Sequence, residues 1–93
     1  MPKQVHAAHI LVKTEQEAGV LLFDLQRGAD FGEMAKKHSL CPSKKQGGDL
    51  GWFGKGQMVG EFEMVAFSAA PGAVSKPFKT QFGWHLVKVL ETR

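Results

Sequence analysis

Two stretches of the chain combine apolar and β-branched residues with very little charge. They are residues 5–13 (VHAAHILVK) and residues 84–90 (WHLVKVL). A strand that is apolar on both faces is typical of the centre of a sheet, where other elements cover both sides. We therefore expect these two strands at the centre of one sheet, with helices on both of its faces.

Two helices are predicted between these strands, in the first half of the chain. Thr14 can cap the first helix, and Glu17 three residues later completes a capping box. Apolar positions then recur at helical spacing until Gly28, which is typical of a helix end. Asp30 can cap a second helix over residues 31–38. The positions expected to face the sheet are Ala18, Leu21, Leu22 and Leu25 in the first helix and Phe31, Met34 and Ala35 in the second.

A glycine-rich stretch, residues 46–67 (QGGDLGWFGKGQMVGEFEMVAF), holds six of the eleven glycines. So many glycines are incompatible with one long regular element, because each weakens a helix or strand relative to alanine. We predict a short strand over residues 49–53, then a turn, and then a helix over residues 59–69 with apolar residues at helical spacing. Met58 and Phe62 then become neighbours four positions apart.

The remaining segment before the last strand is predicted to be an edge strand over residues 74–79, because Pro77 cannot donate a ladder hydrogen bond. The predicted order is β-α-α-β-α-β-β, an α+β fold in which helices cover a four-stranded sheet. The sequence contains no internal repeat or linker. We therefore expect residues 1–93 to form a single domain.

The composition is that of an ordinary globular domain, with 43% hydrophobic and 23% charged residues. No apolar run approaches the ~20 residues of a membrane-spanning helix, and no signal-peptide pattern follows the first residues. The single cysteine, Cys41, excludes an internal disulfide and fits a reducing compartment. We therefore expect a soluble, cytoplasmic monomer.

The net charge is +3, and several lysines are close together in the sequence: Lys36, Lys37, Lys44, Lys45 and Lys55. Such a group usually forms a solvated surface. Weak attraction to an anionic surface, either nucleic acid or lipid headgroups, is the alternative. We expect no specific nucleic-acid partner, because such a protein would show a denser stripe of positive charge.

Four residues carry side chains that could take part in chemistry: His9, Cys41, Thr80 and His85. The two histidines lie inside the most apolar strands, where each must find a hydrogen-bond partner or destabilise the fold. Taken alone, this pattern favours histidines with a structural role in the core, and a functional pair is the alternative.

A metal site is a second alternative, because His6-x-x-His9 and His38-x-x-Cys41 have the spacing of ligand pairs. Residues three apart on a strand point to opposite faces, so His6 and His9 could bind one ion only if the strand were broken. We expect no metal and no other cofactor.

Four segments of the chain, in order, resemble the signature segments of the parvulin family of peptidyl-prolyl cis-trans isomerases. They are AAHILVK (residues 7–13), ADFGEMAKKHSLCPS (29–43), GGDLGWFGKGQMVGEFEMVAFS (47–68) and TQFGWHLVKV (80–89). Agreement over essentially the whole chain is far more specific than one short motif. The resemblance implies a parvulin-like fold with a four-stranded antiparallel sheet, and an enzyme that assists protein folding.

The resemblance also implies a catalytic group. His9 and His85 would lie side by side, hydrogen-bonded to each other and to the hydroxyl of Thr80. Cys41 would act on this pair and on the substrate carbonyl through hydrogen bonding and electrostatics. Some parvulins carry aspartate at the position of Cys41, which argues against obligatory nucleophilic attack. A buried cysteine with a purely structural role is the alternative.

Met58 and Phe62 correspond to the positions that hold the proline ring in the family. Leu50 and Phe82 are expected nearby, and Gln57 is a candidate to bind the substrate backbone. From the sequence alone, ordinary core packing explains the apolar residues equally well. Phe82 stands where some relatives have a small residue, so the resemblance does not determine the shape of the pocket floor.

The connection between the first strand and the first helix bears on the substrate. Phospho-specific parvulins carry a basic loop there that binds phosphate, whereas Lys13-Thr14-Glu15 joins the two elements directly here. We therefore expect substrates that are proline-containing peptides or unfolded proteins, without phosphate specificity. The alternative is a non-catalytic binding module of the same fold for unfolded or anionic partners. The complete set of site residues favours the enzyme.

Overall fold

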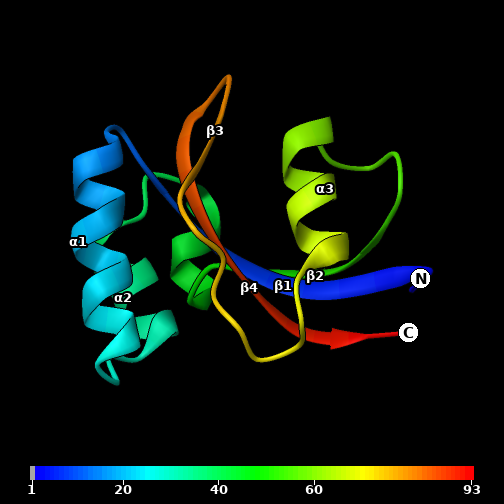
Figure 1. Cartoon of the computed structure of the whole chain (residues 1–93), viewed down its shortest axis with the longest axis horizontal. Helices are drawn as coiled ribbons and strands as arrows, with labels where there is room; N and C mark the ends of the chain where they lie inside the picture. The colour runs from blue at the N-terminus through cyan, green and yellow to red at the C-terminus, as the bar shows by residue number, and fades with distance from the viewer. Residues whose placement is uncertain (1) are drawn as a thin grey trace.

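The computed structural model of the chain describes residues 2–93, which form a sheet with helices on both faces (Figure 1). The sheet has four strands in the order β2-β1-β4-β3, and all neighbouring strands are antiparallel. The strands are β1 (Gln4–Val12), β2 (Asp49–Gly54), β3 (Phe78–Thr80) and β4 (Gly83–Thr92). The two strands expected at the centre, β1 and β4, are the central ones. The predicted α+β fold and its order are confirmed.

The described residues form three α-helices: α1 (Glu15–Gln26), α2 (Phe31–His38) and α3 (Gly60–Ser68). Both predicted N-caps are present, because the Thr14 hydroxyl accepts the N–H of Glu17 and the Asp30 carboxylate accepts the N–H of Glu33. Figure 1 shows α1 and α2 on one face of the sheet and α3 on the other. None of the helices within residues 2–93 combines the length and hydrophobicity needed to cross a bilayer.

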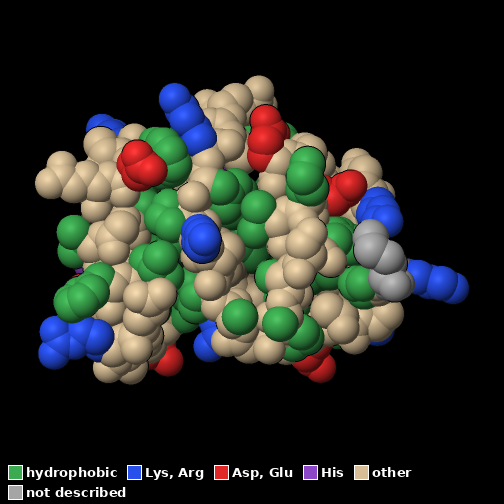
Figure 2. All heavy atoms as spheres, in the orientation of Figure 1, with side chains coloured by type: hydrophobic (Ala, Val, Ile, Leu, Met, Phe, Trp, Pro, Cys, Tyr) green, Lys and Arg blue, Asp and Glu red, His purple; other side chains and the backbone are tan. Residues whose placement is uncertain are grey.

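Each face of the sheet has its own hydrophobic core, because β1 and β4 contribute side chains to both faces alternately. The core under α3 contains Val5, Ala7, Phe53, Phe62, Ala66, Phe67, Val87 and Val89. The core under α1 and α2 contains Ala8, Ile10, Val12, Ala18, Leu21, Phe31, Ala35 and Leu86. Figure 2 shows hydrophobic side chains across the middle of the viewed face, with charged side chains of both signs mostly around its rim and positive charge also near its centre.

Two local predictions were wrong. Residues 74–77 form no strand apart from a bridge between Val74 and Lys88, because Pro77 lacks an N–H and the Ser75 hydroxyl accepts the N–H of Val87. Met58 lies outside α3, before the N-cap residue Val59, so it is not a helical neighbour of Phe62.

The segment after Cys41 also has a defined structure. Cys41 is extended (φ −82°, ψ 143°), which is the usual conformation before a proline. A short 3-10 helix, η1 (Pro42–Gln46), then follows, with Pro42 in its first turn.

The two ends of the described chain are paired in the sheet. The N–H groups of Lys3 and Gln4 both donate to the carbonyl of Arg93 at 2.8 Å, and Arg93 donates to the carbonyl of Gln4 at 3.0 Å. The start of β1 and the end of β4 therefore lie side by side, at the right of Figure 1.

Candidate active site

His9 in β1 and His85 in β4 point to the face of the sheet that α3 covers. Their Nδ1 atoms lie 3.3 Å apart, and their rings stack with centroids separated by 5.4 Å. Nε2 of His85 lies 2.7 Å from the hydroxyl oxygen of Thr80. The contacts implied for these three residues by the family resemblance are therefore present, while their catalytic role stays a prediction.

The position of His9 depends on the glycine-rich stretch. The N–H of His9 donates to the carbonyl of Gly48 at 3.0 Å, so the two backbones lie against each other. Gly48 has φ +84°, and a Cβ at this position would lie 2.3 Å from the carbonyl oxygen of His9. Only glycine satisfies both the conformation and the close approach. The glycines before β2 therefore help to place a residue of β1.

Burial lowers the pKa of both histidines. Loss of hydration, together with the nearby His85 ring, lowers the pKa of His9 from 6.5 to about 4. Loss of hydration also lowers the pKa of His85. Both rings are therefore neutral near pH 7, and only one of them can donate a hydrogen between the two Nδ1 atoms. Nε2 of His9 is buried and has no hydrogen-bond partner among residues 2–93.

A cavity of about 540 Å³ lies beside the histidine pair. It is lined by His9, Leu11, Leu40, Cys41, Pro42, Leu50, Gln57, Met58, Val59, Phe62, Phe82 and His85. Every residue predicted for the site lines this cavity except Thr80, which instead contacts His85 through its hydroxyl. Apart from the histidines, Cys41 and Gln57, the lining side chains are hydrocarbon or thioether groups. The cavity can therefore hold an apolar ring next to two uncharged imidazoles.

Phe62 connects the cavity to the core. Its ring lies edge-on to both histidines, with centroids 5.5 Å from His9 and 5.6 Å from His85. It is only 4% exposed and belongs to the core under α3. Phe62 thus packs in the core and also lines the cavity, while its contact with a proline ring stays a prediction. Phe62 therefore fixes the histidines as well as lining the cavity.

Two predicted residues lie at the edge of the site. Phe82 is 63% exposed at the rim of the cavity. The side-chain oxygen of Gln57 accepts the N–H of Gly54 at 2.7 Å, which closes the turn after β2. This bond leaves the amide nitrogen of Gln57 available to donate to a substrate carbonyl.

The sequence analysis missed several residues of the site: Leu11, Leu40, Pro42, Val59 and Phe78. Phe78 stacks on His85 with centroids 5.3 Å apart. Strand alternation could have identified two of them, because Leu11 follows His9 by two residues and Phe78 precedes Thr80 by two. Leu40 follows α2 and Pro42 begins η1, and in this short segment no periodic pattern marks the side that faces the cavity.

The metal alternative fails on the geometry of β1. The side chain of His6 contacts Asp49 and Glu91, whereas His9 contacts His85 on the opposite face of the sheet. Within residues 2–93, no three His, Cys, Asp or Glu side chains come together as a metal site. The clustered lysines are exposed, and none of them lines the cavity.

Comparison with known proteins assigns the family. Residues 6–91 match the family model described as "Rotamase: PPIC-type PPIASE domain". The chain belongs to the parvulin family. This parvulin is 47% identical over 89 residues to foldase protein PrsA of Geobacillus kaustophilus, and 45% identical over 100 residues to chaperone SurA of Nitrosococcus oceani. These matches cover 95% and 97% of the parvulin but only 32% and 24% of the relatives. The chain thus spans a third or less of their length.

Solved structures of parvulins agree with this fold. PrsA from Bacillus anthracis superposes with a TM-score of 0.97 at 39% identity, over 99% of this chain and 43% of the other. NmPin, the parvulin of Nitrosopumilus maritimus, superposes with a TM-score of 0.88 at 39% identity, over 98% of this chain and 99% of its own. The family resemblance predicted from the sequence is confirmed.

Proposed function

We propose that the chain is a peptidyl-prolyl cis-trans isomerase that rotates Xaa-Pro bonds in unfolded or flexible protein segments and so assists folding. The observation that carries this proposal is a buried, uncharged histidine pair at the wall of an apolar cavity large enough for a proline ring. Family membership and the names foldase and chaperone of its relatives support it.

The reaction requires no covalent chemistry. Rotation about an Xaa-Pro bond has a barrier of about 18–20 kcal/mol, which comes from the resonance that keeps the amide planar. Water favours the charge-separated form of that resonance, so an apolar cavity favours the twisted amide by comparison. Met58 and Phe62 hold the proline ring in this proposal, while the neutral histidines lie beside the rotating amide. Each 1.36 kcal/mol removed from the barrier accelerates rotation about tenfold.

Cys41 has a supporting role in the proposal. It lines the cavity with both histidines and is partly exposed there. A thiol in this place can donate a weak hydrogen bond to the substrate carbonyl or to an imidazole. Rotation needs no nucleophile, so the proposed contribution is orientation and polarity rather than bond formation.

The proposed substrates are general Xaa-Pro segments rather than phosphorylated ones. No lysine or arginine is among the residues that line the cavity. Only Lys13 and Thr14 separate β1 from α1, which leaves no room for a basic loop. A phosphate before proline would therefore lack the cations that recognise it.

We further propose that the domain acts as a monomer in the cytoplasm. The free thiol of Cys41 fits a reducing compartment. Sedimentation and cell fractionation test the two parts of this proposal separately. The exposed lysines give the domain at most a weak, salt-dependent attraction to anionic surfaces.

Exchange spectroscopy by NMR on short Xaa-Pro peptides, with and without phosphate on the preceding residue, tests the function. The wild type should accelerate cis-trans exchange of unphosphorylated peptides, and Met58→Ala should lower kcat/KM about tenfold through lost contact with the proline ring. Met64→Ala is the matched control, because Met64 lies on α3 with its side chain 70% exposed and should leave the rate unchanged. A folded wild type that accelerates exchange of no peptide would refute catalysis and favour the binding module.

A further inference from the structure

The sheet is irregular next to His6. His6 lies opposite Trp52, and two residues further along β1 the partner on β2 is Asp49, which precedes Trp52 by three residues. Leu50 and Gly51 therefore share the space opposite one residue of β1, which makes a β-bulge. Because of this bulge, Asp49 lies on the side of His6, while Leu50 lines the cavity on the other face.

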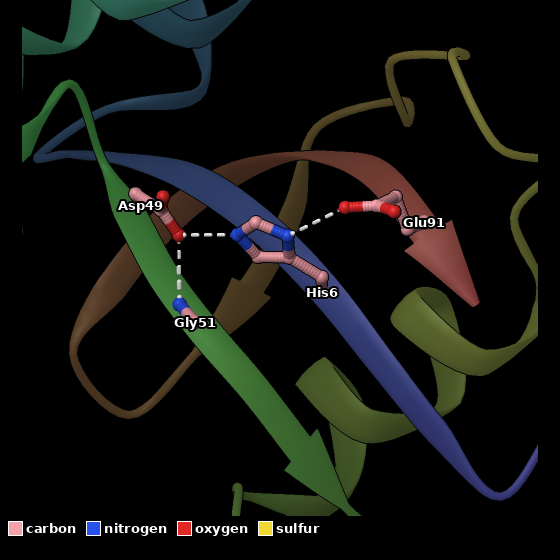
Figure 3. Close-up of polar contacts among 4 residues, drawn as sticks. All are labelled: His6, Asp49, Gly51 and Glu91. Carbon is pink, nitrogen blue, oxygen red and sulfur yellow. Dashed lines mark hydrogen bonds and ion pairs between the residues drawn. The ribbon is translucent and has the colours of Figure 1, made fainter. Parts of the chain in front are cut away.

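The carboxylate of Asp49 holds the bulge in place. Oδ1 of Asp49 accepts the N–H of Gly51 at 2.7 Å and lies 2.8 Å from Nε2 of His6 (Figure 3). Gly51 has φ +72°, a conformation that side-chain-bearing residues rarely adopt. Glycine adopts this conformation without steric cost, and the bond from the carboxylate to the Gly51 N–H fixes the backbone across Leu50. His6 therefore orients the group that fixes the bulge.

His6 also contacts β4, where the pairing skips a residue as well. Nδ1 of His6 lies 3.3 Å from Oε1 of Glu91, and β4 places Leu90 as an extra residue next to this point. A neutral imidazole has one N–H, so it can donate to only one of two carboxylates. Only the imidazolium satisfies both contacts seen in Figure 3. The arrangement is that of a protonated His6 joining two irregular strands.

We propose that His6 is a positioning residue for the proline pocket: by holding Asp49 it holds the bulge that turns Leu50 into the cavity wall, and its protonation strengthens that hold. The proposal rests on the proposed function, since it assigns Leu50 to a pocket for proline. His6 itself does not line the cavity.

The charges around His6 determine the direction of the pH effect. The hydrogen bond to Asp49 raises the pKa of His6 above 6.5, partial burial opposes it, and Glu91 adds to it. The other charged groups on this face are Lys88 and Asp30, which line a shallow cavity with Asp49, and Arg93, whose guanidinium lies 4.1 Å over the ring of Trp52. Protonated His6 is thus favoured in the folded protein, and its contribution is lost as pH rises through its raised pKa.

The histidine pair cannot account for a pH-dependent change in the pocket above the ordinary histidine pKa of 6.5. The pKa of His9 and that of His85 are both lowered by burial, so those rings are already uncharged near pH 7. A change in the pocket that follows the His6 ring signal on the alkaline side of the ordinary histidine value therefore points to His6 rather than to the histidine pair.

The test follows the Gly51 amide, the Leu50 methyl groups and the His6 ring by NMR, together with kcat/KM for peptide exchange, across about pH 5.5 to 9, a range that spans ordinary histidine titration. In the wild type all three signals should titrate together, and kcat/KM should fall about threefold as His6 loses its proton, the size expected for a partly exposed ion pair. In His6→Gln this fall in kcat/KM with pH should disappear. The variant should have, at every pH, the value that the wild type shows at alkaline pH. The matched control is His38→Gln, at the exposed end of α2, which should retain the wild-type profile.

Two results would overturn the proposal. One is a Gly51 amide and Leu50 methyl groups that do not respond when His6 titrates, whatever the activity. The other is a pH profile of His6→Gln that equals that of the wild type. Failure of the proposed function would look different, because the wild type would then accelerate peptide exchange at no pH. In that case the NMR signals, together with peptide-binding shifts at Leu50, would still decide whether His6 positions the pocket.

Discussion

The hydroxyl oxygen of Thr80 lies 2.7 Å from Nε2 of His85 and also accepts the N–H of Phe82 at 3.1 Å. One side chain at the end of β3 therefore fixes the orientation of a buried imidazole and the start of the turn that carries Phe82 to the cavity rim. Since Thr80 is only 4% exposed, water cannot easily replace it. The relationship explains why a residue outside the cavity affects its shape.

Replacing this hydroxyl should therefore weaken both the fold and the site. Thr80→Val keeps the volume but leaves His85 and the Phe82 N–H without a partner, so the free energy of unfolding should fall by about 1–3 kcal/mol and kcat/KM should fall with it. Thr80→Ser should retain most of both values. Urea unfolding and peptide exchange measure the two effects, with Thr92→Val at the exposed end of β4 as control. Equal stability of Thr80→Val and wild type would contradict the role of this hydrogen bond.

Cys41→Ser separates a polar role of the thiol from a covalent one. The hydroxyl can still donate a hydrogen bond, so kcat/KM for peptide exchange should stay within about tenfold of wild type. Loss of an obligatory nucleophile would reduce the rate by a factor on the order of 10⁴ or more. A loss of that size in a folded variant would refute non-covalent rotation.

The histidine pair should make the protein sensitive to acid. The pKa of His9 is about 4 in the folded protein against 6.5 ordinarily, so the unfolded chain binds the proton first as pH falls. The stabilisation is complete above pH 6.5 and is lost as pH falls toward 4, by up to about 3 kcal/mol for His9. His85 shifts in the same direction.

Urea unfolding at a series of pH values measures this loss. His9→Gln should flatten the profile between pH 6.5 and 4, while His38→Gln on the exposed end of α2 should not. Parallel profiles of wild type and His9→Gln would show that His9 is not buried in its neutral form.

Two glycines give opposite predictions for the same substitution. Gly48→Ala places a methyl group 2.3 Å from the carbonyl oxygen of His9 at φ +84°, so it should destabilise the protein by about 2 kcal/mol or more. Gly19→Ala in α1 meets nothing within 4 Å and should stabilise it by about 0.5–1 kcal/mol. Thermal unfolding of the two variants distinguishes them. Equal effects of the two changes would contradict the close approach of Gly48 to His9.

The periodic parts of the sequence predicted the fold well. Strands β1 and β4 and helix α2 carry long, consistent patterns of burial, and Thr14 and Asp30 mark helix starts through their own local hydrogen bonds. The short 3-10 helix after Cys41 and the absence of a strand over residues 74–77 depend on single prolines and on contacts with distant strands. Patterns along the chain do not contain those contacts.

The site was predictable where family motifs cover it and unpredictable where it depends on long-range irregularities. His6 was considered only as half of a metal-ligand pair, because its partners Asp49 and Glu91 lie 43 and 85 residues away in the sequence. The bulge that brings Asp49 to His6 also leaves no periodic pattern in the sequence. Gly51 was placed inside the predicted strand over residues 49–53, and the side of the sheet that receives Leu50 follows only from the paired strands.

The pairing of Gln4 with Arg93 has a consequence for how this domain can be used in larger chains. Because residues at both ends of the described chain are hydrogen-bonded to each other, a few linking residues could join them, and new ends could be opened in the exposed turn between α1 and α2, at residues 27–29. The same geometry would let a host protein carry the whole domain as an insertion in one surface loop, since the loop's two stems would leave the domain at a single point.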